Sequence, residues 1–227
     1  MSEWRLFNSR VELDGALTEY IGERLQAEIN NGGRASLAVS GGSTPRGLFR
    51  GLSHSPTDWS QVDITLVDER WVASDSDQSN ERLVRDELLQ NRAACANFVG
   101  LKCDAPAPEI AVKEIIANLA EVHRPFSAVV LGMGEDGHTA SWFPEASNLL
   151  TLLDPNGMTL LAATDPVTAP HQRLTLTMAA VLDSHEIVIH VTGEAKRAVL
   201  QSAQDNQPPI AAILAQTAVP VSIWWAP

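Results

Sequence analysis

The sequence predicts a doubly wound α/β fold of Rossmann type, with a mainly parallel sheet that carries helices on both faces. Short apolar runs typical of buried strands recur along the chain, and amphipathic segments of helical length separate most of them. This alternation indicates a parallel sheet, because each parallel strand needs a crossover connection before the next. A chain of 227 residues is long enough for one sizeable core, so we expect a single domain over residues 1–227.

The first expected elements are a helix and a buried strand joined by a turn. Residues 11–29 have helical spacing of apolar positions, Asn31-Gly32-Gly33 breaks that spacing, and the apolar run 35–40 follows. Further strands are expected at 62–67, 127–131, 159–163, 186–191 and 219–224. Further helices are expected at 45–52, 80–90, 109–122 and 194–203, several of them beginning with Pro or a small polar residue. We expect Trp224 and Trp225 in the core, with an interface as the alternative.

The composition excludes several classes of function. A formal net charge of -12 at pH 7 repels nucleic acid and anionic lipid surfaces. No run approaches ~20 apolar residues, and the start of the chain lacks a basic stretch followed by an apolar one. We therefore expect a cytoplasmic protein without nucleic-acid or membrane partners. Cys95 and Cys103 lack the spacing of a zinc site, so we expect free thiols and no metal.

The segment 40–45, with the sequence Ser40-Gly41-Gly42-Ser43-Thr44-Pro45, has the features of a phosphate-binding loop. It follows a predicted strand and places Pro at the start of a helix. Its glycines let the backbone approach a ligand, and the free N–H groups of the helix start attract a phosphate. The alternative is a plain strand-to-helix turn. The segment is not a Walker loop, because the Gly-x-x-x-x-Gly-Lys-Ser/Thr pattern is missing.

The most informative segment is 129–144, which follows another predicted strand. Three glycines, two acids and His138 fall within seven residues there. The glycines match Gly-x-Gly-x-x-Gly, but that pattern is weak evidence of nucleotide binding in a segment so far from the start of the chain. A neutral imidazole next to Asp136 suits general-base chemistry, because histidine is the side chain that most readily takes up a proton near neutral pH. A histidine that only holds the loop together is the alternative.

Three cationic side chains lie where they can face a ligand at the carboxyl ends of the strands. Arg70 ends the charged run Asp68-Glu69-Arg70 that follows an apolar strand, and Arg173 lies at another element boundary. Lys196 falls in the first turn of a predicted helix, where a cation opposes the helix dipole unless an anion compensates it. For each, surface solvation is the alternative.

Together these segments resemble the 6-phosphogluconolactonase family, within the superfamily that also contains glucosamine-6-phosphate isomerases. The matching runs are 40–45, 68–70, 132–144, 173–177 and 193–196, in the family's order. The specific part is the Asp-Gly-His-Thr-Ala-Ser-x-Phe-Pro run at 136–144, whereas related isomerases and deaminases share the glycine-serine loop. Two departures, Glu135 and a Trp142 in place of a smaller aliphatic residue, are expected to alter the pocket wall slightly.

The resemblance implies hydrolysis of 6-phospho-D-glucono-1,5-lactone in the oxidative pentose phosphate pathway, without a metal or organic cofactor. It implies a fold like that of glucosamine-6-phosphate deaminase and ribose-5-phosphate isomerase. We expect a monomer or small homo-oligomer. His138 would activate water, and Asp136 would orient the imidazole or place the substrate. The residues implied in phosphate or substrate binding are Gly41, Gly42, Ser43, Thr44, Arg70, Arg173 and Lys196. Arg70 or backbone N–H groups would stabilise the oxyanion of the tetrahedral intermediate.

Three alternatives stay open at this point. Ser43 or Ser141 as a nucleophile is disfavoured, because neither lies in a Gly-x-Ser-x-Gly elbow. An amino-sugar-phosphate deaminase or isomerase would carry Asp-Glu-Tyr in place of Asp68-Glu69-Arg70, and Asn-Glu-Pro in place of Trp142-Phe143-Pro144. A non-catalytic sugar-phosphate sensor is the third, and the presence of both Asp136 and His138 weighs against it.

Overall fold

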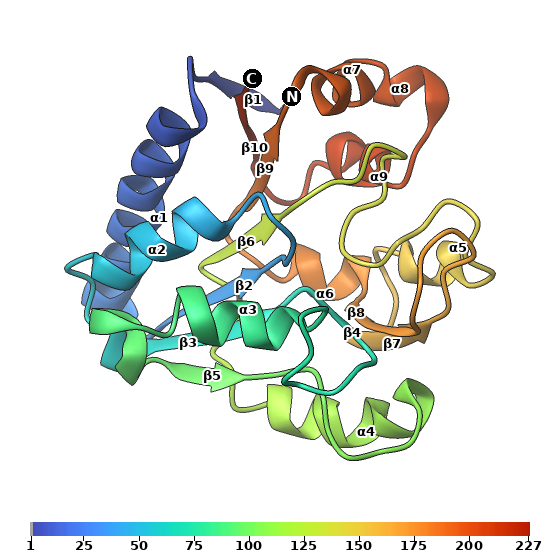
Figure 1. Ribbon diagram of the computed structural model, residues 1–227, viewed down its shortest axis with the longest axis horizontal. Helices are drawn as coiled ribbons and strands as arrows, with labels where there is room; N and C mark the ends of the chain where they lie inside the picture. The colour runs from blue at the N-terminus through green and yellow to red at the C-terminus, as the bar shows by residue number, and fades with distance from the viewer. Residues whose placement is uncertain (1) are drawn as a thin grey trace.

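The computed structural model describes residues 2–227, which contain a seven-stranded sheet with helices packed around it (Figure 1). All neighbouring strands in this sheet are parallel. The strands, in spatial order, are β1 (Glu3–Leu6), β10 (Val221–Ala226), β9 (Ile187–Thr192), β6 (Ala128–Leu131), β2 (Ala35–Val39), β3 (Val62–Leu66) and β5 (Asn97–Val99). The predicted α/β class is confirmed.

The helices divide between the two faces of the sheet, as right-handed crossovers require. One face carries α1 (Arg10–Gly32), α2 (Arg46–His54) and α3 (Asn80–Glu87) (Figure 1). The other carries α4 (Pro108–Leu119), α6 (Met178–Leu182), α7 (Glu194–Gln201), α8 (Ala203–Asn206) and α9 (Ile210–Ala215). Helix α1 begins at a Ser9 cap, whose Oγ accepts the N–H of Glu12 at 3.2 Å, and ends at Gly33 with φ 83°.

A second, three-stranded antiparallel sheet was not predicted. It consists of β4 (Asp68–Arg70), β8 (Arg173–Leu176) and β7 (Leu161–Thr164), in that order. The apolar run 159–163 was expected in the parallel sheet, and that expectation is wrong, because β7 pairs antiparallel with β8. A short helix α5 (Leu149–Leu152) precedes it, and 3₁₀ turns lie at Trp59–Gln61 and Asn91–Cys95.

The core lies between the main sheet and its helices. Every residue of β2, β3 and β6 is buried, which is typical of central parallel strands. Trp224 and Trp225 are buried, as predicted, and Cys95 and Cys103 are free thiols, also as predicted. Among residues 2–227, no helix has the length and apolar character needed to cross a bilayer.

The centre of the sheet is where the topology changes direction. Neighbouring strands β2 and β6 pair in parallel, yet the chain leaves β2 for α2 on one face, whereas the connection beyond β6 leads to α6 on the other. In open α/β sheets the two diverging connections leave a crevice at the carboxyl ends of the strands. The loops predicted to carry the chemistry, 40–45 and 132–144, are the two that follow these strands.

Candidate active site

A cavity of about 430 Å³ opens at this crevice. Its wall includes every predicted site residue except one: Gly41, Gly42, Ser43, Thr44, Arg70, His138, Arg173 and Lys196. The exception is Asp136, which reaches the cavity only through its contact with His138. Segments more than 150 positions apart in the sequence therefore converge on one site.

The loop after β2 exposes backbone donors to this cavity. Gly42 has φ 91°, a conformation that favours glycine. In the described part of the chain, no side chain caps the start of α2, so its first N–H groups stay available to an anion. Ser40 Oγ accepts the backbone N–H of Gly132 at 2.9 Å, which holds this loop against the loop after β6.

His138 and Asp136 form a hydrogen-bonded pair beside the loop after β2. Asp136 Oδ1 lies 2.6 Å from His138 Nδ1 and also accepts the backbone N–H of His138 at 3.1 Å. The imidazole stacks on Phe143, with ring centroids 4.3 Å apart. A carboxylate at Nδ1 favours the tautomer that carries its proton there, which leaves Nε2 as an acceptor. The pair therefore has the arrangement of an oriented general base.

The three predicted cations surround the remaining wall. Arg70 and Arg173 are opposite each other on paired strands, and the carbonyl oxygens of Gln78 and Pro170 accept from their guanidinium groups at 2.6 and 2.9 Å. Burial lowers the pKa of Arg173 and of Lys196 from their ordinary values. Lys196 is the third residue of α7. A desolvated cation at the start of a helix is the environment that an anionic ligand would stabilise.

The cavity also has an acceptor side, which the sequence did not single out. Asp68 and Asn80 line it, and Asn80 Nδ2 donates to the carbonyl oxygen of Asp68 at 2.9 Å. Asp68 belongs to the charged run 68–70, in which only Arg70 was predicted to contact the substrate. Asn80 opens a predicted helix, and nothing in the sequence indicates that its side chain turns toward the loop after β2.

Two residues have environments that differ from an expected or alternative role. Ser141 is fully buried and donates its Oγ–H to Asp68 Oδ2 at 2.6 Å, so it does not face the cavity as a nucleophile would. Trp142 was expected in the pocket wall, and that expectation is wrong. It is completely buried, and its Nε1–H donates to the carbonyl oxygen of Leu176 at 2.9 Å. Glu135, the other departure, is exposed and also lies outside the wall.

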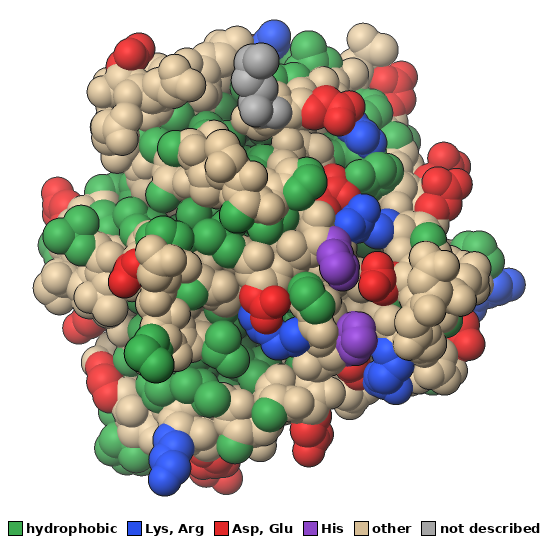
Figure 2. Space-filling view, turned by 180° about the vertical axis from the view of Figure 1, so that it is seen from behind, with side chains coloured by type: hydrophobic (Ala, Val, Ile, Leu, Met, Phe, Trp, Pro, Cys, Tyr) green, Lys and Arg blue, Asp and Glu red, His purple; other side chains and the backbone are tan. Residues whose placement is uncertain are grey.

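The local charge of the cavity differs from that of the molecule as a whole. Acidic and basic side chains are interspersed over the face seen in Figure 2, in keeping with the acidic net charge. The cavity, by contrast, gathers Arg70, Arg173 and Lys196 beside backbone donors. Among residues 2–227, no group of three His, Cys, Asp or Glu side chains is arranged to hold a metal ion. The arrangement can bind a small anion and present an oriented base to it.

Comparison with known proteins points to a single family. Residues 8–224 match the family model described as glucosamine-6-phosphate isomerases/6-phosphogluconolactonase. The 6-phosphogluconolactonase of Rhizobium meliloti is 43% identical over 226 residues, covering 98% of this chain and 97% of that protein. The 6-phosphogluconolactonase of Mesorhizobium japonicum is also 43% identical, with 99% and 95% coverage. The crystal structure of a 6-phosphogluconolactonase from Shewanella baltica superposes with a TM-score of 0.97 at 45% identity, covering 100% of this chain and 98% of that one.

Proposed function

The chain belongs to the family of glucosamine-6-phosphate isomerases and 6-phosphogluconolactonases, and we propose that it hydrolyses 6-phospho-D-glucono-1,5-lactone with water activated by His138. The product is 6-phospho-D-gluconate, and the reaction is the second step of the oxidative pentose phosphate pathway. The lactonase activity rests on relatives of the same name that align over nearly the whole chain. The chain is thus a carboxylic ester hydrolase of carbohydrate metabolism.

The proposed reaction starts at Nε2 of His138. This nitrogen takes a proton from water as the water oxygen attacks C1 of the lactone, and Asp136 stabilises the imidazolium that forms. The C1–O5 bond of the tetrahedral intermediate then breaks, and the imidazolium returns its proton to the departing O5. Arg70 is our candidate for stabilising the oxyanion at C1, because it lines the same cavity as His138.

The phosphate of the substrate is proposed to lie at the loop after β2. Backbone N–H groups and hydroxyls of Gly41, Gly42, Ser43 and Thr44 would donate to it. Among residues 2–227, no side chain caps the start of α2 and would compete. Arg173 and Lys196 would neutralise its charge. Such concentrated donors are what a protein with a net charge of -12 needs in order to bind an anion.

We also propose a cytoplasmic location and a monomeric or small homo-oligomeric state, without nucleic-acid or membrane partners. The acidic net charge supports the exclusion of polyanions. Sedimentation of the purified protein, with and without added DNA, would test both the assembly state and the exclusion.

A single observation carries the mechanism: the His138–Asp136 pair opens on the same cavity as the predicted phosphate loop. The test is a coupled assay in which glucose-6-phosphate dehydrogenase makes fresh lactone and acid release is followed against spontaneous opening. We expect His138→Ala to lower kcat by about 10²–10⁴ and to leave binding of 6-phosphogluconate nearly unchanged in calorimetry. His185→Ala is the matched control, because His185 lies beside the opposite edge of the sheet, before β9.

Each result has a defined meaning. Full turnover in His138→Ala would remove this histidine from the mechanism. If the native protein failed to accelerate lactone opening but released ammonia from glucosamine 6-phosphate, the deaminase alternative would replace our proposal. Binding of 6-phosphogluconate without turnover of either substrate would favour the sensor.

A further inference from the structure

Glu69 is a buried carboxylate next to the cavity that the proposed reaction does not use. It is the middle residue of β4, only 1% of its surface is exposed, and it is absent from the cavity wall. Four donors reach its two oxygens. Oε1 accepts the backbone N–H groups of Arg70 at 2.7 Å and Asn80 at 2.8 Å. Oε2 accepts the N–H of Glu81 at 2.7 Å and the hydroxyl of Ser79 at 3.0 Å.

These contacts join a strand to the start of a helix. Three of the four donors belong to residues 79–81, where α3 begins, and the fourth belongs to β4 itself. Burial raises the pKa of Glu69, and the four donors oppose that rise. A buried carboxylate is retained at low cost only when its oxygens are fully hydrogen-bonded, as they are here.

Asn80 extends this junction to the loop after β2. Its Nδ2 donates to the carbonyl oxygen of Asp68, and its Oδ1 lies 1.8 Å from the place where a Cβ on Gly41 would stand. The amide therefore fills the space that the missing side chain of Gly41 leaves. Any movement of Asn80 changes both the Asp68 side of the cavity and the space beside Gly41.

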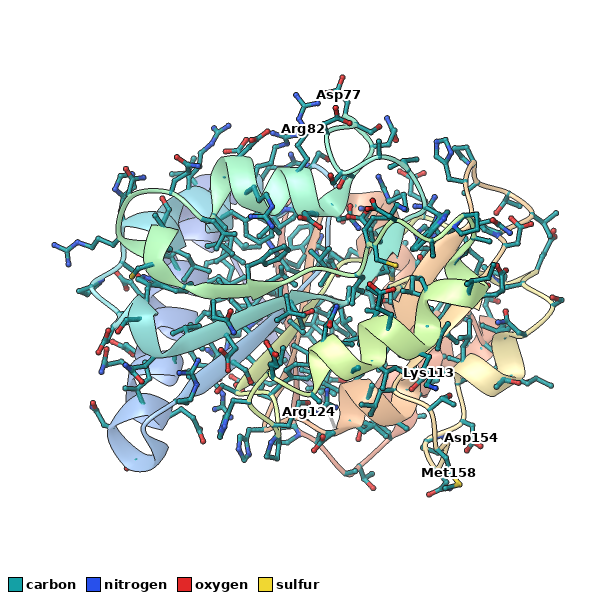
Figure 3. The ribbon with its side chains drawn as sticks, turned by 90° about the horizontal axis from the view of Figure 1, so that it is seen from below. Asp77, Arg82, Lys113, Arg124, Asp154 and Met158 are labelled. Carbon is teal, nitrogen blue, oxygen red and sulfur yellow. The ribbon has the colours of Figure 1, made fainter. Side chains whose placement is uncertain are left out.

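Arg70 is also held by contacts between β4 and the start of α3. Its backbone N–H donates to Glu69, and its guanidinium donates to the carbonyl oxygen of Gln78, just before α3. The segment between β4 and α3 that contains Gln78 is itself held to α3 by an ion pair, because Asp77 Oδ1 lies 2.7 Å from Arg82 Nη1. These two side chains lie close together at the outer edge of the molecule (Figure 3).

We propose that Glu69 is a positioning residue for the lactonase reaction: it acts through Asn80 and Arg70, and so fixes the acceptor side of the cavity relative to the phosphate loop. The inference rests on the proposed function, since it assigns those two residues to substrate binding. The role given to Glu69 is nevertheless an indirect one, because its side chain is buried and does not line the cavity. A carboxylate is required at this position, since only a residue with two acceptor oxygens satisfies all four donors, two at each oxygen.

The main test compares Glu69→Gln with Glu186→Gln. Glutamine keeps the shape but replaces one acceptor oxygen with an NH₂ group, so two of the four donors lose their partner. We expect kcat/KM for the lactone to fall by about 10-fold or more, because small misplacements of binding groups have large effects. Glu186 is a matched control, because it is also buried and accepts hydrogen bonds from Tyr20 and Ser222. It lies just before β9, at the amino ends of the strands. Its variant should lose stability and keep kcat/KM.

A double-mutant cycle tests the route through Asn80. In Asn80→Ala the backbone donor to Glu69 remains, whereas the contacts with Asp68 and Gly41 are lost. If Glu69 acts through this side chain, Glu69→Gln lowers kcat/KM less in the Asn80→Ala background than in the native one. Additive losses overturn this route.

The remaining outcomes are also decisive. Native kcat/KM in folded Glu69→Gln, or an equal loss in Glu186→Gln, overturns the proposal. If Glu69→Gln does not fold, Asn80→Ala alone decides: unchanged kcat/KM there overturns the proposal, and a loss of about 10-fold or more with a native-like thermal transition supports it. Failure of the proposed function is a different result, because the native protein would then not accelerate lactone opening.

Discussion

The position of the His138 ring depends on the absence of a side chain at Gly134. A Cβ there would stand 2.3 Å from Cε1 and Nδ1 of His138 and 2.5 Å from Oδ1 of Asp136. The alanine methyl and the hydrogen-bonded pair cannot occupy the same space, so we expect Gly134→Ala to displace the ring. If His138 is the base, as proposed, kcat should fall by about 10²-fold, with KM for the lactone little changed. Steady-state kinetics in the coupled assay would measure both constants.

Gly15→Ala is the control for that substitution. Gly15 lies inside α1. Among residues 2–227, and apart from its chain neighbours and the adjacent helix backbone, no atom lies within 4 Å of the place its Cβ would take. Alanine there should raise the free energy of unfolding by about 0.5–1 kcal/mol, as expected for Gly to Ala inside a helix. Native-like kcat in Gly134→Ala would mean that the loop adapts to the added methyl and that the ring position is not decisive.

If Lys196 contacts the phosphate, as proposed, ligand binding should weaken as the pH becomes alkaline. Burial lowers its pKa below the ordinary 10.5, the nearby Glu135 opposes this, and Arg10 adds to it. As the pH rises through this lowered pKa, the side chain loses its charge, and the Kd for 6-phosphogluconate should increase. Calorimetry with this stable product avoids the spontaneous opening of the lactone. In Lys196→Arg the cation stays protonated, so the dependence in this range should vanish; if it persists there, another group causes it.

At the scale of elements, strands and helices with a clear apolar pattern could be predicted from the sequence, whereas short strands without a clear apolar run could not. The helix at 11–29 and the strands at 35–40 and 62–67 correspond to α1, β2 and β3, because burial on a helix face or within a central strand leaves a long apolar signal. Strands β1, β4, β5 and β8 have only three or four residues each, and β4 consists entirely of charged residues. Pairing direction, which was wrong for 159–163, depends on the partner strand β8 rather than on local pattern.

Asp63 connects four segments at the amino edge of the sheet, and its replacement tests that connection. Burial alone would raise its pKa, but hydrogen bonds from Arg34, Asn97 and the backbone N–H of His123 outweigh burial and lower it from 3.8. We expect Asp63→Asn to lower the free energy of unfolding by about 2–3 kcal/mol near pH 7, since charge-assisted bonds are lost.

The sign of its pH dependence follows from the lowered pKa. The stability that ionised Asp63 contributes is fully present above the ordinary pKa and is lost as the pH falls through the lowered value. Urea unfolding between about pH 7 and pH 3 should therefore show the difference between native protein and variant shrinking with acidity. Asp183→Asn, which removes a partly exposed pair with Arg124, should lower the free energy by less than about 1 kcal/mol. A constant difference for Asp63→Asn across the range would contradict this sign.

At the scale of the whole molecule, the candidate site assembles from loops that sequence patterns could identify one by one. Each loop followed a recognisable strand, and sheet topology places carboxyl ends at one edge, so convergence of Ser43, His138 and Lys196 was predictable. The roles of these residues stay predictions, as does the single domain. The acceptor side was not predictable, because the turn of Asn80 toward Gly41 depends on Glu69 capping α3.

If this assembled cavity recognises phosphate, ligand binding should stabilise the whole fold. A ligand at 100 times its Kd that binds only the folded state adds about 2.7 kcal/mol, which for a chain of this size raises Tm by about 5–10 °C. We expect that shift with 6-phosphogluconate and almost none with gluconate at the same concentration, because only the former engages the start of α2 and Lys196. Lys196→Ala, which should mainly raise KM, should also reduce the shift. Equal shifts with both sugars would mean that the sugar hydroxyls, and not the phosphate, account for recognition.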